Sequence, residues 1–179
     1  VQNPQKSIYK FKKPFFNSYL KNGNITLTSS IVLRRDIISS LGGFNESKSI
    51  SGSEDYDMWF RISSITDRFH VINKNMGYLT IGDDNFSNDK KLKKALLILI
   101  PRFEKLCMNQ RSKPSYMYYL ACSLYIRSSD FTKAFRFFRL FIINDLRFIK
   151  SVKLLIKLIL ALFLQSIFFR QIFKRNFKS

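Results

Sequence analysis

The segment Ser53-Glu54-Asp55-Tyr56-Asp57-Met58-Trp59-Phe60-Arg61 decides how the fold is predicted. Ser53 is a favourable residue to begin a helix, and the acids that follow it are stabilised there by the helix dipole. Apolar residues recur at helical spacing as far as Ile65, and Asp57 and Arg61 are spaced for an ion pair within one helix. The segment therefore predicts a helix with an acidic first turn. Capping of a core helix would explain these acids without catalysis, and this alternative stays open from the residues alone.

The residues on either side of this helix predict a mixed fold. Strands are expected at residues 25–33, 69–74 and 77–81, which are rich in β-branched and aromatic side chains and are bounded by turn residues. A short helix over residues 34–41 is expected to end at Gly42 and Gly43. From Lys90 onward the apolar period is helical. The predicted fold class is α/β, with few strands, followed by an α-helical C-terminal extension.

Charge is distributed unevenly along the chain. Residues 1–36 carry a formal charge of +6, residues 37–89 carry −4 and residues 90–179 carry +17, which together give the net charge of +19. The acidic middle is therefore chemically distinct, and the C-terminal half is expected to seek an anionic partner. Cys107 and Cys122 lie in apolar helical patterns without metal-like spacing, so we expect buried thiols in a reducing compartment.

The C-terminal residues predict a helix on a membrane surface. Basic residues at helical spacing precede an uncharged run over residues 158–169, which would be about 18 Å long as a helix and so too short to span a bilayer. An interfacial helix on an anionic leaflet fits this pattern. The residues expected to contact the membrane are Arg147, Lys150, Lys153, Lys157, Phe163, Phe168 and Phe169. A buried helix packed on residues 116–144 and a short spanning segment remain as alternatives.

Four blocks over roughly residues 24–87 resemble the C-terminal half of the inverting family 2 glycosyltransferases, which have the GT-A fold. The blocks are Ser29–Arg35, Leu41–Glu46, Glu54–Arg61 and Gly77-Tyr78. Their order and spacing make the resemblance more specific than any single block. It implies that residues 1–89 form the acceptor-side part of a GT-A domain. Independently of the resemblance, the helical apolar spacing predicts that residues 90–146 form a helical extension with a tetratricopeptide-like hairpin, and the basic and apolar pattern predicts that residues 147–179 form the membrane-surface helix.

The resemblance also implies roles for individual residues. Asp55 would be the general base that deprotonates the acceptor hydroxyl, which is chemistry that a carboxylate within hydrogen-bonding reach can perform. Glu54, Asp57, Trp59 and Arg61 would orient or support the acceptor side. The loop before the site would carry Gly42, Gly43 and Glu46. The expected function is sugar transfer from a nucleotide-sugar donor to a glycan or lipid-linked hydroxyl, with inversion, in bacterial cell-surface polysaccharide or lipopolysaccharide synthesis, at the cytoplasmic inner face of the plasma membrane.

The chain also departs from the family. Nothing in residues 1–24 matches the nucleotide-binding units or the Asp-x-Asp metal motif, and Asp83-Asp84 comes after the acceptor block. Residues 79–81 lack the Arg-x-His that many members carry. A divalent cation, Mn or Mg, is expected for the complete enzyme, with no metal ligands in this chain. We therefore expect a fragment, a split gene or a decayed copy that is inactive alone.

Two other function classes remain open. One is a basic, aromatic-rich protein that binds RNA or single-stranded nucleic acid, with aromatic residues between lysines in residues 8–21 as stacking platforms. The strongly apolar run near the C-terminus disfavours this alternative. The other is a membrane-associated adaptor without catalysis, built on the helical hairpin.

Overall fold

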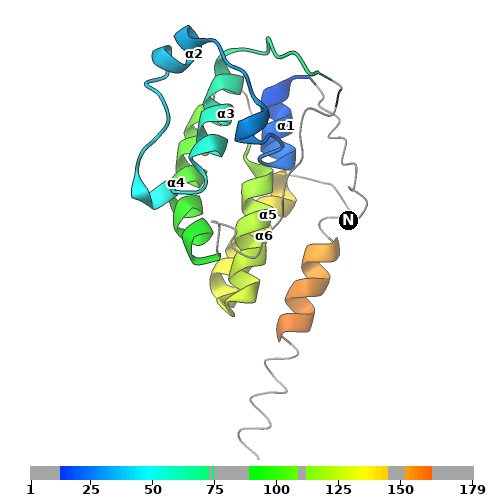
Figure 1. Ribbon diagram of the computed structural model, residues 1–179. Coiled ribbons are helices and arrows are strands. Elements are labelled where there is room, and N and C mark those ends of the chain that lie inside the picture. The colour runs from blue at the N-terminus through cyan, green and yellow to red at the C-terminus, as the bar shows by residue number, and fades with distance from the viewer. Residues whose placement is uncertain (1–12, 73, 75–88, 109–111, 145–151, 163–179) are drawn as a thin grey trace, which may run out of the picture. The chain divides into compact units, whose positions relative to one another are not determined.

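The computed structural model describes residues 13–72, 74, 89–108, 112–144 and 152–162. The chain divides into two compact units, Val1–Ser112 and Lys113–Ser179. Every regular element in the described residues is an α-helix or a short 3-10 helix (Figure 1). Each unit is described by itself below.

The expectation of a GT-A α/β fold is wrong for the described residues, which are helical and contain no strand. Residues 25–33 keep extended backbone angles at Leu27 and Ile31, but between them lies the 3-10 helix η1 (Thr28–Ser30). A strand requires a neighbour to which its amides and carbonyls can bond. No described residue pairs with this segment as a strand, and the Val32 side chain is 99% exposed. Residues 69–72 have no regular structure, and the strand predicted at residues 77–81 lies outside the described part.

Helix α1 (Phe15–Asn22) presents aromatic side chains to the core of the first unit. Phe16 and Tyr19 are buried, and the Phe16 ring lies 4.8 Å from the Phe60 ring between centroids. The amide of Phe15 donates a hydrogen bond of 2.7 Å to Oδ1 of Asp67. Because the first amides of a helix have no partner within the helix, this contact stabilises the start of α1.

Helix α2 (Arg35–Ser40) confirms the short helix predicted before the two glycines. Gly42 and Gly43 have φ angles of +74° and +76°, a conformation that side chains with a Cβ disfavour. A Cβ added at either glycine would meet nothing within 4 Å. Backbone conformation, and not a lack of space, therefore explains the two glycines. The 3-10 helix η2 (Lys48–Ile50) follows, and its Ile50 is fully buried.

Helix α3 (Glu54–Ile65) confirms the central helix prediction and forms the core of the first unit with α4 (Asp89–Cys107). The Phe60 and Phe103 rings stack with centroids 3.7 Å apart and an angle of 5° between their planes. Met58 and Ile62 are also buried. Pro101 lies inside α4, which continues as one helix through this residue.

The second unit contains a helical hairpin of α5 (Ser115–Arg127) and α6 (Phe131–Asn144), as predicted from the sequence. The Tyr125 and Phe137 rings stack across the hairpin with centroids 5.7 Å apart. Asp130 precedes α6 and caps it, since its Oδ1 accepts a hydrogen bond of 3.2 Å from the Lys133 amide. A further helix covers residues 152–162.

Candidate functional site

Asp55 lies in the first turn of α3, half-buried, with both carboxylate oxygens engaged. Oδ2 accepts hydrogen bonds from Nδ2 of Asn24, at 2.9 Å, and from Oγ1 of Thr28, at 3.1 Å. Oδ1 accepts a bond of 2.6 Å from the Tyr56 amide. Charge-assisted bonds of this kind are stronger than neutral ones and hold a carboxylate in one orientation. Asn24, after α1, and Thr28, the first residue of η1, therefore position the acid that the resemblance implies is the general base.

A hydrogen-bonded chain extends from Asn24 into the core. The Thr26 hydroxyl donates to Oδ1 of Asn24 at 3.4 Å, and Oη of Tyr19 lies 3.2 Å from Oγ1 of Thr26. Burial raises the pKa of Tyr19 above its ordinary value of 10.0; the Thr26 hydrogen bond opposes this shift, and the charge of Asp55 adds to it. Tyr19 therefore stays neutral at physiological pH and acts as a hydrogen-bonding anchor for this segment.

The start of α3 is capped differently from the prediction. Ser53 occupies the N-cap position, but its side chain makes no capping hydrogen bond. Instead, Oε2 of Glu54 accepts a bond of 2.6 Å from the Gly52 amide, and the Ser53 carbonyl accepts the first helical bond, from the Asp57 amide. Glu54 thus holds the turn before the helix, which accounts for this acid without a role in catalysis.

Asp57 is fully buried between two arginines, away from solvent. Nε of Arg61 donates to Oδ2 of Asp57 at 2.9 Å, which confirms the predicted ion pair within α3. Nε of Arg102, on α4, lies 3.1 Å from Oδ1 of Asp57, an ion-pair contact without hydrogen-bond geometry. Arg61 also donates to the carbonyls of Leu41, at 2.7 Å, and Gly43, at 2.8 Å. Arg61 therefore connects α3 to the loop that contains Gly42 and Gly43, and Asp57 connects α3 to α4.

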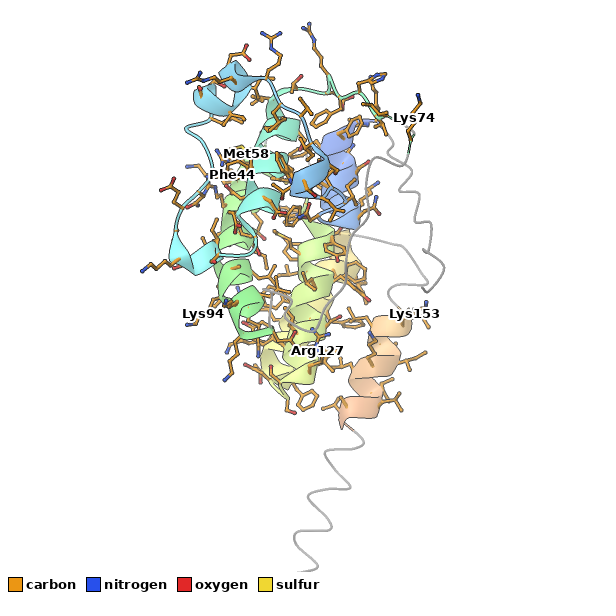
Figure 2. The ribbon with its side chains drawn as sticks, in the orientation of Figure 1. Phe44, Met58, Lys74, Lys94, Arg127 and Lys153 are labelled. Atoms are coloured by element: carbon orange, nitrogen blue, oxygen red, sulfur yellow. The ribbon has the colours of Figure 1, made fainter. Side chains whose placement is uncertain are left out.

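The remaining predicted support residues lie around the glycine loop. Trp59 is buried and meets the Phe44 ring edge to face, with centroids 5.8 Å apart. Its Nε1 has no hydrogen-bond partner in the described part of the chain. Glu46 is exposed. Figure 2 labels Phe44, in the segment that follows α2, and Met58, in α3.

Several predicted positions lie outside the described residues. These are Tyr78 with residues 79–81, Asp83, Asp84, Arg147, Lys150, Phe163, Phe168 and Phe169. Lys153 and Lys157 are described, and both are exposed on the helix of residues 152–162. No described helix has the length and apolar character required to cross a bilayer.

The described part of the chain shows no candidate metal centre. Among the side chains that the structure describes, no three of His, Cys, Asp or Glu come together in a group that could hold an ion. Asp55 has hydrogen-bond donors as its neighbours, and Asp57 has arginines. We therefore derive no catalytic step through a metal.

Sequence reasoning missed Asn24, Thr28 and Arg102. Asn24 and Thr28 contact Asp55 from 31 and 27 residues away. Helical periodicity reports neighbours within one element only, so no local signal could have identified these partners.

Comparison with protein-family models, with curated proteins and with solved structures finds no match to this chain.

Proposed function

We propose that the first unit contributes the acceptor-side base of a glycosyl-transfer site, with Asp55 as that base. One observation supports this proposal most. Asp55 is half-buried at the start of α3, and its Oδ2 accepts hydrogen bonds from Asn24 and Thr28. A carboxylate can accept about four hydrogen bonds, and three are described here, so capacity remains for an acceptor hydroxyl. The sequence blocks around Asp55 support the same assignment.

The other two acids of the first turn are less suited to this role. Glu54 bonds the turn that precedes its own helix. Asp57 is fully buried and paired with two arginines, so an acceptor cannot reach it. Asp55 is the acid of this turn that is partly exposed and also oriented by side chains from a distant segment.

In the proposed reaction, Asp55 takes the proton of the acceptor hydroxyl as its oxygen attacks the anomeric carbon of a nucleotide sugar. The bond from that carbon to the diphosphate oxygen breaks, and the nucleoside diphosphate leaves with the electron pair. Attack from the face opposite the leaving group inverts the anomeric carbon. A donor-binding part would come from outside the described residues, and we expect the purified chain alone not to transfer sugar.

The acceptor class that we propose is a glycan or lipid-linked hydroxyl of a surface polysaccharide, glycosylated at the cytoplasmic face of the plasma membrane. Complementation tests the proposal in the source cell. A strain without the gene should show an altered surface-glycan profile, which the wild-type chain and Asp36→Asn restore and Asp55→Asn does not. Asp36 is an exposed acid of α2 paired with Arg34, so it controls for the loss of one charge. An unaltered profile in the deletion strain, or full restoration by Asp55→Asn, would refute the proposal.

A further inference from the structure

The helix of residues 152–162 leaves most of its aliphatic side chains uncovered. Leu154 and Leu158 are buried, with exposed fractions of 0% and 5%. The remaining leucines and isoleucines are 41–55% exposed: Leu155, Ile156, Ile159, Leu160 and Leu162. At about 100° per residue, these five residues occupy one continuous arc of roughly 160°. We call this arc the exposed aliphatic face.

Two lysines border the exposed aliphatic face. Lys153 and Lys157 are one helical turn apart, and they fall between Leu160 and the buried leucines on the helical wheel. Both are exposed, and Figure 2 labels Lys153 in the first turn of this helix. The sequence contains no Asp or Glu after Asp145. One edge of the face is thus cationic, with no acid on the helix to neutralise it.

We propose that the exposed aliphatic face binds the surface of an anionic lipid bilayer, with the helix axis parallel to the membrane plane. A contiguous apolar patch of this kind on one helix marks an interaction site. Lysines at the edge of the face can reach acidic headgroups while the leucines and isoleucines enter the upper acyl region. In the sequence, the uncharged run between Lys157 and Arg170 would be about 18 Å long as a helix, short of the roughly 30 Å hydrocarbon thickness, so we place the helix on the membrane. Nucleic acid has no apolar surface that would cover five aliphatic side chains.

This inference does not depend on Asp55 or on sugar transfer, and it has its own test. The full chain is sedimented with vesicles of phosphatidylcholine alone and with vesicles that also contain phosphatidylglycerol. The wild type should partition onto the anionic vesicles, less so at high salt, and only weakly onto the neutral ones. Ile159→Asn combined with Leu160→Asn should weaken partitioning by about tenfold or more. Val32→Asn is the matched control, because Val32 is 99% exposed in the first unit.

A second pair of variants tests the lysines. Lys153→Gln with Lys157→Gln should weaken binding to anionic vesicles by roughly 30-fold. The control is Lys90→Gln with Lys94→Gln, an exposed pair on α4 with the same spacing and the same change of net charge. We expect this control to change binding by less than about threefold. Circular dichroism checks that each variant remains folded.

Three results would overturn the proposal. The wild type could fail to bind anionic vesicles. The Ile159/Leu160 or Lys153/Lys157 variants could bind like the wild type. Alternatively, sedimentation equilibrium could show a dimer that Ile159→Asn with Leu160→Asn dissociates while vesicle binding is unchanged, in which case a second copy of the chain covers the face.

Discussion

Nδ2 of Asn24 lies 2.9 Å from Oδ2 of Asp55, although the two residues are 31 positions apart in the chain. This contact, together with that of Thr28, connects the loop after α1 to the acidic start of α3. The carboxylate is therefore oriented by tertiary structure as well as by its own helix. Asn24 and Thr28 therefore help to set the orientation of the Asp55 carboxylate.

Thr28→Val should weaken the orientation of Asp55, because the 3.1 Å bond from the hydroxyl to Oδ2 is lost. In a transfer assay with membranes that contain the donor-binding part, we expect kcat to fall about tenfold with little change in KM for the donor. Thr28→Ser keeps a hydroxyl and should retain most of the activity. Equal kcat for the Val variant and the wild type would contradict a positioning role.

Arg61→Met should destabilise the first unit by about 3 kcal/mol, because it leaves Asp57 buried with only Arg102 beside it and frees the carbonyls of Leu41 and Gly43. The measurement is urea unfolding followed by tryptophan fluorescence, since Trp59 is the one tryptophan of the chain. Arg34→Met is the control: its ion pair with Asp36 is exposed on both sides, so the midpoint should hardly move. A similar small effect for Arg61→Met would show that the buried pair does not stabilise the fold.

Gly43→Ala should cost about 1–2 kcal/mol, because the φ of +76° is unfavourable for alanine. No atom lies within 4 Å of the added Cβ, so the cost is conformational and not steric. Gly43→Asn should cost less, since asparagine tolerates positive φ better. Urea unfolding should rank the wild type as most stable, Gly43→Asn next and Gly43→Ala last. An alanine variant as stable as the wild type would argue against this backbone conformation.

Stability of the second unit should fall in alkaline solution through Cys122. Burial raises the pKa of its thiol from 9.0 to about 12, so the unfolded chain releases this proton at a lower pH than the folded chain. The contribution is complete below pH 9 and is lost as pH rises towards 12, by up to about 1 kcal/mol at pH 10. Urea unfolding at pH 8 and pH 10, followed by circular dichroism, should show a smaller pH effect in Cys122→Ala. Parallel losses in both proteins would exclude the thiol as the cause.

Local patterns predicted much of this structure. The helix at Ser53 to Arg61, the Asp57–Arg61 pair and the α5–α6 hairpin all depend on residues within a few turns of one another, which periodicity and spacing report directly. The strand predicted at residues 25–33 failed because β-branched composition cannot show whether a pairing partner is present. Contacts of Asp55 with Asn24 and of Asp57 with Arg102 join distant segments, so only the folded chain reveals them.

The central claim, that Asp55 is the base for sugar transfer to a hydroxyl, is tested most directly by a reconstituted transfer assay. Membranes from a source strain that lacks the gene are supplied with the purified full chain, and incorporation of label from nucleotide sugars into the lipid fraction is measured. We predict that the wild type and Asp36→Asn restore incorporation. Asp55→Asn, which should fold and bind the membranes to the same extent, should incorporate label at least about 100-fold more slowly. Incorporation by Asp55→Asn at the wild-type rate would contradict the claim.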